Sequence, residues 1–171
     1  MKSSKSLGIS RLSSHHQKMS NGLLPMKNRS NILQLAVGKK CFRASRSIGS
    51  CLLLEFGKQI PYLNHKNQKR TKGEYGLLIE MGEWILSKQD AQILSSESDI
   101  QKIDTNIHIL EDKSITNISL NKKGDLEISF DTAYSLKIPF NSSETDLWIF
   151  FTPSVSYWLD QRGRWQQEER K

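Results

Sequence analysis

The sequence predicts an α+β fold that is mostly β: two similar antiparallel β-meanders packed together, with one amphipathic helix at about 97–109 between them. Three observations lead to this prediction. Short apolar runs separated by polar turns recur after residue 31, which is typical of half-buried strands. One segment has apolar residues at the three- and four-residue spacing of a helix. The strand-rich blocks on either side of that segment resemble each other.

Length and charge distribution predict the domain organisation. A chain of 171 residues fits one domain. Residues 1–54 contain ten Lys/Arg and no acid, whereas residues 55–171 contain fifteen Lys/Arg and eighteen Asp/Glu. We expect a disordered basic tail at 1–30, a single β-rich domain with an internal duplication at 31–165, and a frayed C-terminus at 166–171.

The basic tail has alternative interpretations. Its serine-rich, acid-free composition also resembles an organellar targeting segment, and Met19 or Met26 could be the true start. No apolar run is long enough to cross a bilayer, so no membrane contact is expected. Cys41 and Cys51 do not make a disulfide framework. We expect free thiols and a cytoplasmic protein.

The first block predicts strands at about 41–45, 50–56 and 75–81, with another beginning at Trp84. Leu52, Leu54 and Phe56 share one face of the second of these strands at period two. Residues 58–73 have no periodicity and are predicted as a polar, basic loop. Residues 32–37 fit either a strand or one helical turn.

The helix at 97–109 is predicted from its start signal and its apolar stripe. Ser96 followed by Asp99 resembles a capping box. The stripe recurs at three and four residues and consists of Ile100, Ile103, Ile107 and Leu110.

The second block predicts strands at 115–120, 126–130, 134–140 and 147–152. A shift of 74 residues overlays 39–57 on 113–131 without a gap, and the Tyr75 and Trp84-Ile85 landmarks recur as Tyr134 and Trp148-Ile149. We therefore predict one four-stranded meander used twice, at about 36–86 and 110–150. A single meander cannot bury its own apolar face. The triplets Leu52/Leu54/Phe56 and Leu126/Ile128/Phe130 are therefore expected in one interior.

Motifs for chemistry are not found, so no catalytic, cofactor-binding or metal-binding residue is predicted. The histidines (His15, His16, His65 and His108) lack the spacing of metal ligands. The sequence contains neither a nucleophile elbow nor a phosphate-binding glycine loop. These absences favour a non-catalytic binding protein over an enzyme.

A weak resemblance rests on packing motifs: Gly38-Lys39, Leu52-x-Leu54-x-Phe56, Leu126-x-Ile128-x-Phe130 and Trp148-Ile149. The chain resembles small uncharacterised bacterial β-rich proteins with a repeated strand–turn–strand unit, some of which look like immunity proteins that bind a cognate toxin. The resemblance implies a protein-interaction module with a protein partner. Because the motifs are packing features, no functional residue is carried over.

Candidate contact residues are basic or aromatic. They are Lys69, Arg70, Tyr157, Trp158, Arg162, Arg164 and Trp165. Because basic and aromatic residues together can bind single-stranded nucleic acid, one alternative is a nucleic-acid-binding accessory protein using the basic tail and the 64–73 loop. The other alternative is a small-ligand-binding β-fold with a cavity between the two halves. The sequence predicts neither the partner's identity nor the oligomeric state.

Overall fold

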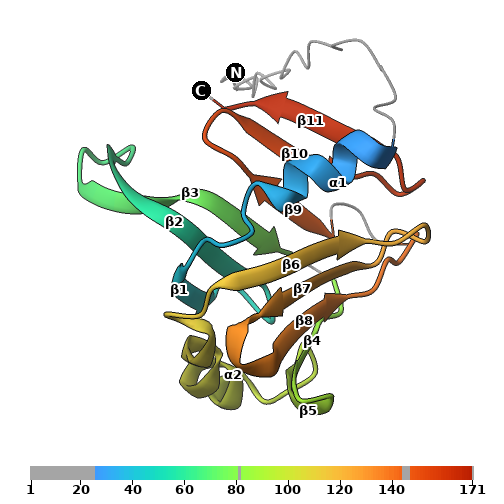
Figure 1. Ribbon diagram of the computed structural model, residues 1–171. Helices are drawn as coiled ribbons and strands as arrows, with labels where there is room; N and C mark the ends of the chain where they lie inside the picture. The colour runs from blue at the N-terminus through green and yellow to red at the C-terminus, as the bar shows by residue number, and fades with distance from the viewer. Residues whose placement is uncertain (1–25, 81, 144–146, 171) are drawn as a thin grey trace, which may run out of the picture.

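The computed structural model describes residues 26–80, 82–143 and 147–170, which form two antiparallel sheets lying face to face (Figure 1). The six-stranded sheet has the order β1-β2-β3-β9-β10-β11, and its strands are Cys41–Arg46, Leu52–Leu63, Lys69–Ile79, Trp148–Phe151, Val155–Leu159 and Trp165–Glu169. The five-stranded sheet has the order β5-β4-β8-β7-β6, and its strands are Ala91–Ser95, Ile85–Lys88, Tyr134–Ile138, Leu126–Phe130 and Ile115–Leu120. The prediction of a mostly β fold with two antiparallel sheets is confirmed.

Four helical segments accompany the sheets: α1 (Met26–Gln34), α2 (Ile100–Asn106), and the short 3-10 helices η1 (Ile107–Leu110) and η2 (Asp131–Ala133). Helix α2 is shorter than predicted at its start, because Asp99 rather than Ser96 caps it by accepting from the backbone N–H groups of Gln101 and Lys102. Three members of the predicted stripe, Ile103, Ile107 and Leu110, are buried, whereas Ile100 is exposed.

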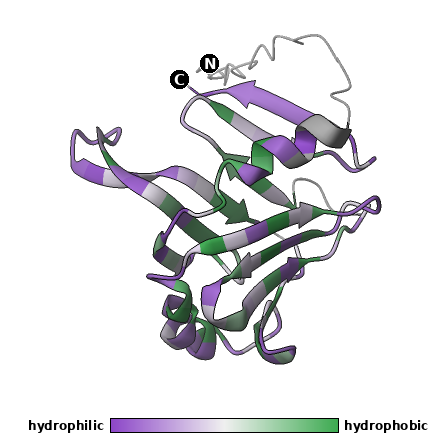
Figure 2. Cartoon of the chain, in the orientation of Figure 1, coloured by the Kyte–Doolittle hydropathy of each residue, from purple (hydrophilic) through white to green (hydrophobic). Residues whose placement is uncertain are grey.

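One hydrophobic core fills the space between the sheets. Both predicted triplets, Leu52/Leu54/Phe56 and Leu126/Ile128/Phe130, belong to the same buried cluster. The rings of Phe56 and Phe130 meet across the interior, with their centroids 6.4 Å apart. Figure 2 shows the hydrophobic residues along the strands where the two sheets face each other. The expectation of a shared interior is confirmed.

The two halves of the chain each begin with three consecutive strands, β1–β2–β3 in the first half and β6–β7–β8 in the second. The first two strands of each set pair in matching register. Cys41 lies opposite Phe56 in β1–β2, and Ile115 lies opposite Phe130 in β6–β7, which is the same pairing displaced by 74 residues. Both ladders then have a register shift at the same place, between residues 41 and 43 and between residues 115 and 117. The sequence likeness therefore corresponds to a likeness in hydrogen bonding.

The fourth strand of each half differs from the prediction, because it leaves its own meander. Strand β4 pairs with β8 and strand β9 pairs with β3, so each half contributes one strand to the other half's sheet. The crossing places Trp84 and Trp148 inside the core, where they are almost completely buried. Because tryptophan is large and mostly apolar, burial of these two side chains stabilises the packed sheets.

The helical segments α1 and η1 lie against one edge strand of each sheet. Gln34 at the end of α1 donates from its side-chain amide to the carbonyl of Ile118 on edge strand β6, at 2.5 Å. Glu111, which follows η1, accepts from the backbone N–H of Ala44 on edge strand β1, at 3.1 Å. Edge strands left uncovered can pair with other chains, so these contacts protect one edge of each sheet.

Helix α1 differs from the prediction, which gives a strand or one helical turn at 32–37 and a disordered tail at 1–30. Helix α1 begins at Met26 and ends at Gln34. Leu33 in the helix and Ala36 in the turn that follows it are both buried. The predictions for residues 1–25 lie outside the described residues.

Candidate partner-binding surface

A two-stranded arm, residues 58–73, projects from the six-stranded sheet beyond the body of the molecule (Figure 1). The arm is made by the distal parts of β2 and β3, and its ladder pairs Gln59 with Gly73 and continues to Leu63 opposite Lys69. The prediction of a loop at 58–73 is therefore wrong. An antiparallel ladder can extend without a buried face, since its backbone hydrogen bonds need no hydrophobic alternation.

The tip of the arm is closed by a turn in which one side chain replaces missing backbone contacts. The side-chain oxygen of Asn64 accepts from the backbone N–H groups of Lys66 and Gln68, at 2.9 and 3.0 Å. Asn67 takes a positive φ of 55°, which asparagine tolerates better than most residues. The turn therefore has a defined conformation and fixes the register of the arm.

The base of the arm is fastened to the sheet by a buried carboxylate. Glu55, only 7% exposed, accepts from the backbone N–H of Gly73 at 2.9 Å and from the guanidinium of Arg43 at 2.6 Å. Arg43 donates in addition to the carbonyl of Thr71, at 3.1 Å. These bonds span the register shift between Phe56 and Gln59 and fix the direction in which the arm leaves the sheet.

Close packing at this base explains why residue 73 is glycine. A Cβ atom there would overlap the carbonyl oxygen of Tyr75 and would come within 3.0 Å of the backbone of Phe56. The β7–β8 connection of the other half has no such arm: η2 links the two strands directly, and Ser129 stands in the register position of Glu55. The carboxylate anchor thus belongs to the half that carries the arm.

The arm is strongly basic and has apolar side chains exposed to solvent. Residues 58–73 contain no Asp or Glu and five Lys/Arg, namely Lys58, Lys66, Lys69, Arg70 and Lys72. Leu63 is 61% exposed and Tyr62 is 41% exposed, and both are among the most exposed large apolar residues that the structure describes. The ammonium of Lys72 lies 5.6 Å from the centre of the Tyr62 ring. The arm therefore combines positive charge with uncovered apolar area.

The two faces of the arm differ in composition. Side chains of directly opposed residues share a face in an antiparallel ladder. Tyr62 lies opposite Arg70, whereas Leu63 lies opposite Lys69. One face therefore presents an aromatic ring with cations, and the other presents an aliphatic side chain with a cation.

The predicted contact residues divide between two places. Lys69 and Arg70 are exposed on strand β3 in the arm. The remaining five lie on β10, β11 and the turn between them: Tyr157, Trp158, Arg162, Arg164 and Trp165.

Packing contacts occupy much of the C-terminal group. Trp165 is buried, with its ring centroid 6.1 Å from that of Trp148 and 5.5 Å from that of Tyr157. Burial also raises the pKa of the Tyr157 hydroxyl. Arg164 forms an ion pair with Asp160, at 2.7 Å. Trp158 is partly exposed and Arg162 is exposed. In this group Arg162 has the greatest freedom to contact another molecule.

Within the described residues, no group of three or more His, Cys, Asp or Glu side chains is placed to hold a metal ion. No helix in this part of the chain is both long and apolar enough to cross a membrane. Cys41 and Cys51 are free thiols, as expected, and burial raises the pKa of Cys41 to about 12.

The chain was compared with protein-family models, with curated proteins and with solved structures, and none of the three comparisons found a match.

Proposed function

We propose that the protein is a non-catalytic protein-interaction module that binds an acidic protein partner through the arm. The observation that carries the proposal is a projecting hairpin with five Lys/Arg, no acid and two exposed apolar side chains. Because a buried carboxylate anchors its base, the arm loses little conformational freedom when a partner binds. An immunity-like protein that binds a toxin is one form of this function, and unpaired cysteines favour a reducing cytoplasm.

A protein partner accounts for both chemical features of the arm. Lys69 and Arg70 favour a partner surface of negative charge, since complementary charge accelerates encounter and fixes orientation. Leu63 contributes to binding only if it is covered by another apolar surface, because anchors of this kind act in desolvated contacts. Phosphate groups alone would not cover it.

The proposal is tested by site-specific photo-crosslinking in the native host. A benzoylphenylalanine placed at Leu63 should give one discrete protein adduct. The same residue placed at Ile48, which is 85% exposed in the β1–β2 turn, provides the control and should not give that adduct. Absence of a specific adduct from residue 63, or the same adduct from both residues, would contradict the proposal.

Charge reversal then tests the contribution of the cations. Lys69→Glu with Arg70→Glu should abolish the adduct at residue 63. Lys40→Glu with Lys102→Glu makes the same change in net charge on exposed residues outside the arm and should leave the adduct in place. Single variants at Lys69 and Arg70 show which face of the arm the partner contacts.

A nucleic-acid partner is the second candidate function, favoured by the placement of Tyr62 opposite Arg70 and beside Lys72 on one face of the ribbon. Two-stranded ribbons fit the major groove of DNA, and aromatic rings with cations stack on single strands. This function requires a Kd that rises steeply with salt. Reversal of Lys69 and Arg70 should weaken that binding, and a salt-independent Kd would exclude it.

We further propose that residues of about 36–86 and 110–150 are two copies of one ancestral unit. The matching registers and bulges of β1–β2 and β6–β7 support this proposal, as do the reciprocal exchange of β4 and β9 and the reciprocal covering of β1 and β6. In this interpretation the arm and its Glu55 anchor are additions to one copy.

A further inference from the structure

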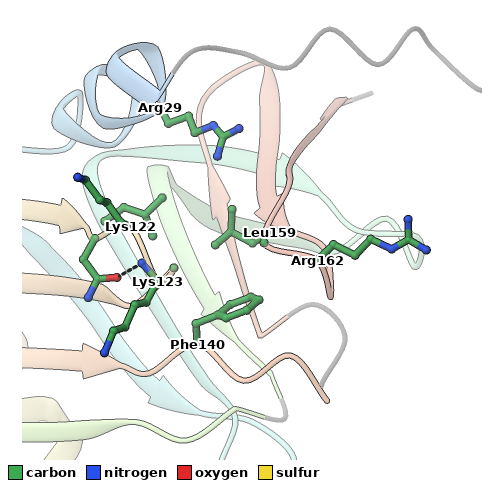
Figure 3. Close-up of a pocket in the computed structure, with 10 residues that line it drawn as sticks. Arg29, Lys122, Lys123, Phe140, Leu159 and Arg162 are labelled. Carbon is green, nitrogen blue, oxygen red and sulfur yellow. Dashed lines mark hydrogen bonds between the residues drawn. The ribbon is translucent and has the colours of Figure 1, made fainter.

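A pocket of about 160 Å³ lies at the end of the molecule away from the arm, where α1 meets two hairpin turns (Figure 3). It is bordered by Arg29 of α1, by the β6–β7 turn and by the β10–β11 turn. Its apolar part consists of Leu120, Phe140 and Leu159. Its basic residues are Arg29, Lys122, Lys123 and Arg162, and none of the described residues that line it is Asp or Glu. The pocket thus combines an apolar floor with a cationic rim.

Figure 3 shows the ring of Phe140 beside Leu159 in the middle of the pocket, Arg29 above it, Lys122 and Lys123 on one side and Arg162 on the other. The side chains of Lys122, Lys123 and Arg162 are long and exposed, so their charged ends can turn towards a bound anion. The floor is fixed more firmly. The ring of Phe140 packs against Gly124, where a Cβ atom would come within 2.9 Å of it.

Both turns are rigid, because an Asn or Asp side chain organises each of them. Asn121 accepts from the backbone N–H groups of Lys123 and Asp125, at 2.8 and 3.0 Å. Asp160 accepts from those of Arg162 and Arg164, both at 2.9 Å. The carboxylate of Asp160 therefore bonds within its own turn and to Arg164, and the rim remains positively charged.

At the corresponding place in the other half, one side chain joins a helix to a hairpin turn. Arg46 has the register position of Leu120, and its guanidinium forms two hydrogen bonds with Asp104 of α2, at 2.6 and 2.8 Å. The same guanidinium donates to the carbonyls of Ser47 and Gly49 in the β1–β2 turn. An internal ion pair thus holds helix and turn together in one half, whereas apolar side chains and like charges border the pocket in the other.

We propose that this pocket binds a small organic anion: one planar apolar group on Phe140, Leu120 and Leu159, and one phosphate or carboxylate group on the rim of Lys122, Lys123 and Arg162. The volume suits a single ring, since an apolar cavity of about 150 Å³ holds benzene. Arginine and lysine are the usual ligands of phosphate and carboxylate groups. This site is separate from the arm and does not depend on the function proposed for the arm.

The test is a titration of the full, ¹⁵N-labelled chain in which the amide signals of Gly124 and Gly163 report on the two turns. Phenyl phosphate and benzoate distinguish the two anionic groups, whereas inorganic phosphate and benzyl alcohol each lack half of the proposed chemistry. At least one of the two aromatic anions should give saturable shifts of both glycines with a Kd of about 0.1–10 mM. Inorganic phosphate and benzyl alcohol should bind at least about tenfold more weakly.

Two independent variants locate the site. Lys122→Glu with Lys123→Glu, and separately Arg162→Glu, should each raise the Kd by about tenfold or more. Lys40→Glu with Lys102→Glu should leave the Kd unchanged apart from a small nonspecific effect of charge. The proposal is overturned if neither aromatic anion saturates, if inorganic phosphate or benzyl alcohol binds as tightly, or if both rim variants keep the original Kd.

Discussion

Removal of the buried carboxylate of Glu55 should destabilise the arm more than the rest of the fold. In Glu55→Ala the buried N–H of Gly73 loses its acceptor, which costs about 1–3 kcal/mol. The lost ion pair with Arg43 adds no more than about 1 kcal/mol, because that guanidinium is 42% exposed. A total of about 1–4 kcal/mol corresponds to a fall in melting temperature of about 2–16 °C for a chain of this size.

Two control variants separate the contributions. Glu55→Gln keeps a side-chain oxygen near the N–H of Gly73 and should cost only about 1 kcal/mol. Glu127→Ala removes an exposed carboxylate whose ion pair with Lys137 is 3.9 Å long, and it should cost less than about 0.5 kcal/mol.

Thermal unfolding measures the global effect, and hydrogen exchange measures the local one. In Glu55→Ala the amides of residues 59–72 should exchange at least about tenfold faster, while the protection of core strands β7 and β8 should fall only with global stability. A melting temperature within about 1 °C of that of the parent chain, or unchanged exchange in the arm, would refute the assignment of Glu55 as its anchor.

Three further predictions concern the core and the titrating groups. Under native conditions thiol reagents should modify the partly exposed Cys51. Cys41 should react only on unfolding, because it is buried and its pKa is raised to about 12. Equal rates of modification at the two cysteines would contradict this prediction. Phe56→Ala and Phe130→Ala should each lower the free energy of unfolding in urea by about 3–5 kcal/mol. Because the two rings pack together, the loss in the double variant should differ from the sum of the single losses by about 0.5–1.5 kcal/mol. Strict additivity would argue against a shared core. Hydrogen bonds from the backbone N–H of Phe140 and from the Asn121 amide hold the pKa of Asp125 below its ordinary 3.8. The stability that ionised Asp125 supplies above that pH should therefore disappear as the pH falls through the lowered pKa. Asp125→Asn should reduce this acid sensitivity, and an unaltered dependence of stability on pH would contradict the cause assigned to the shift.

Much of the fold could be predicted from the sequence because alternating apolar residues determine which face of a strand is buried. Leu52, Leu54 and Phe56 have that pattern, and their partners in the second half repeat it. The same pattern does not determine which sheet a strand joins. Strand β4 would bury the same residues whether it paired with β3 or with β8, and so the exchange of fourth strands was missed.

The arm was missed for a different reason. Residues 58–73 are mostly exposed, so burial leaves no periodic signal in their sequence. The available signal was local: an Asn64–Asn67 turn flanked by the strand-forming residues Ile60, Tyr62 and Thr71. Lys69 and Arg70 were nevertheless identified from charge alone. The pocket brings together residues distant in the sequence, and of its basic rim only Arg162 was predicted as a contact.

We propose that the arm is a binding element separate from the fold, a claim that deletion of the arm tests. The second half of the chain provides the template for this deletion variant. In the variant, the tripeptide Asp-Thr-Ala, which is the sequence of η2, joins Phe56 directly to Tyr75. The two residues that anchor the arm are replaced by the residues at the same register positions of the second half, Glu55→Ser and Arg43→Asn. Calorimetry then compares the affinity of this chain and of the parent chain for the protein captured through residue 63. We predict a melting temperature within about 5 °C of the parent chain and complete loss of binding. A folded armless chain that binds with unchanged affinity would contradict the claim.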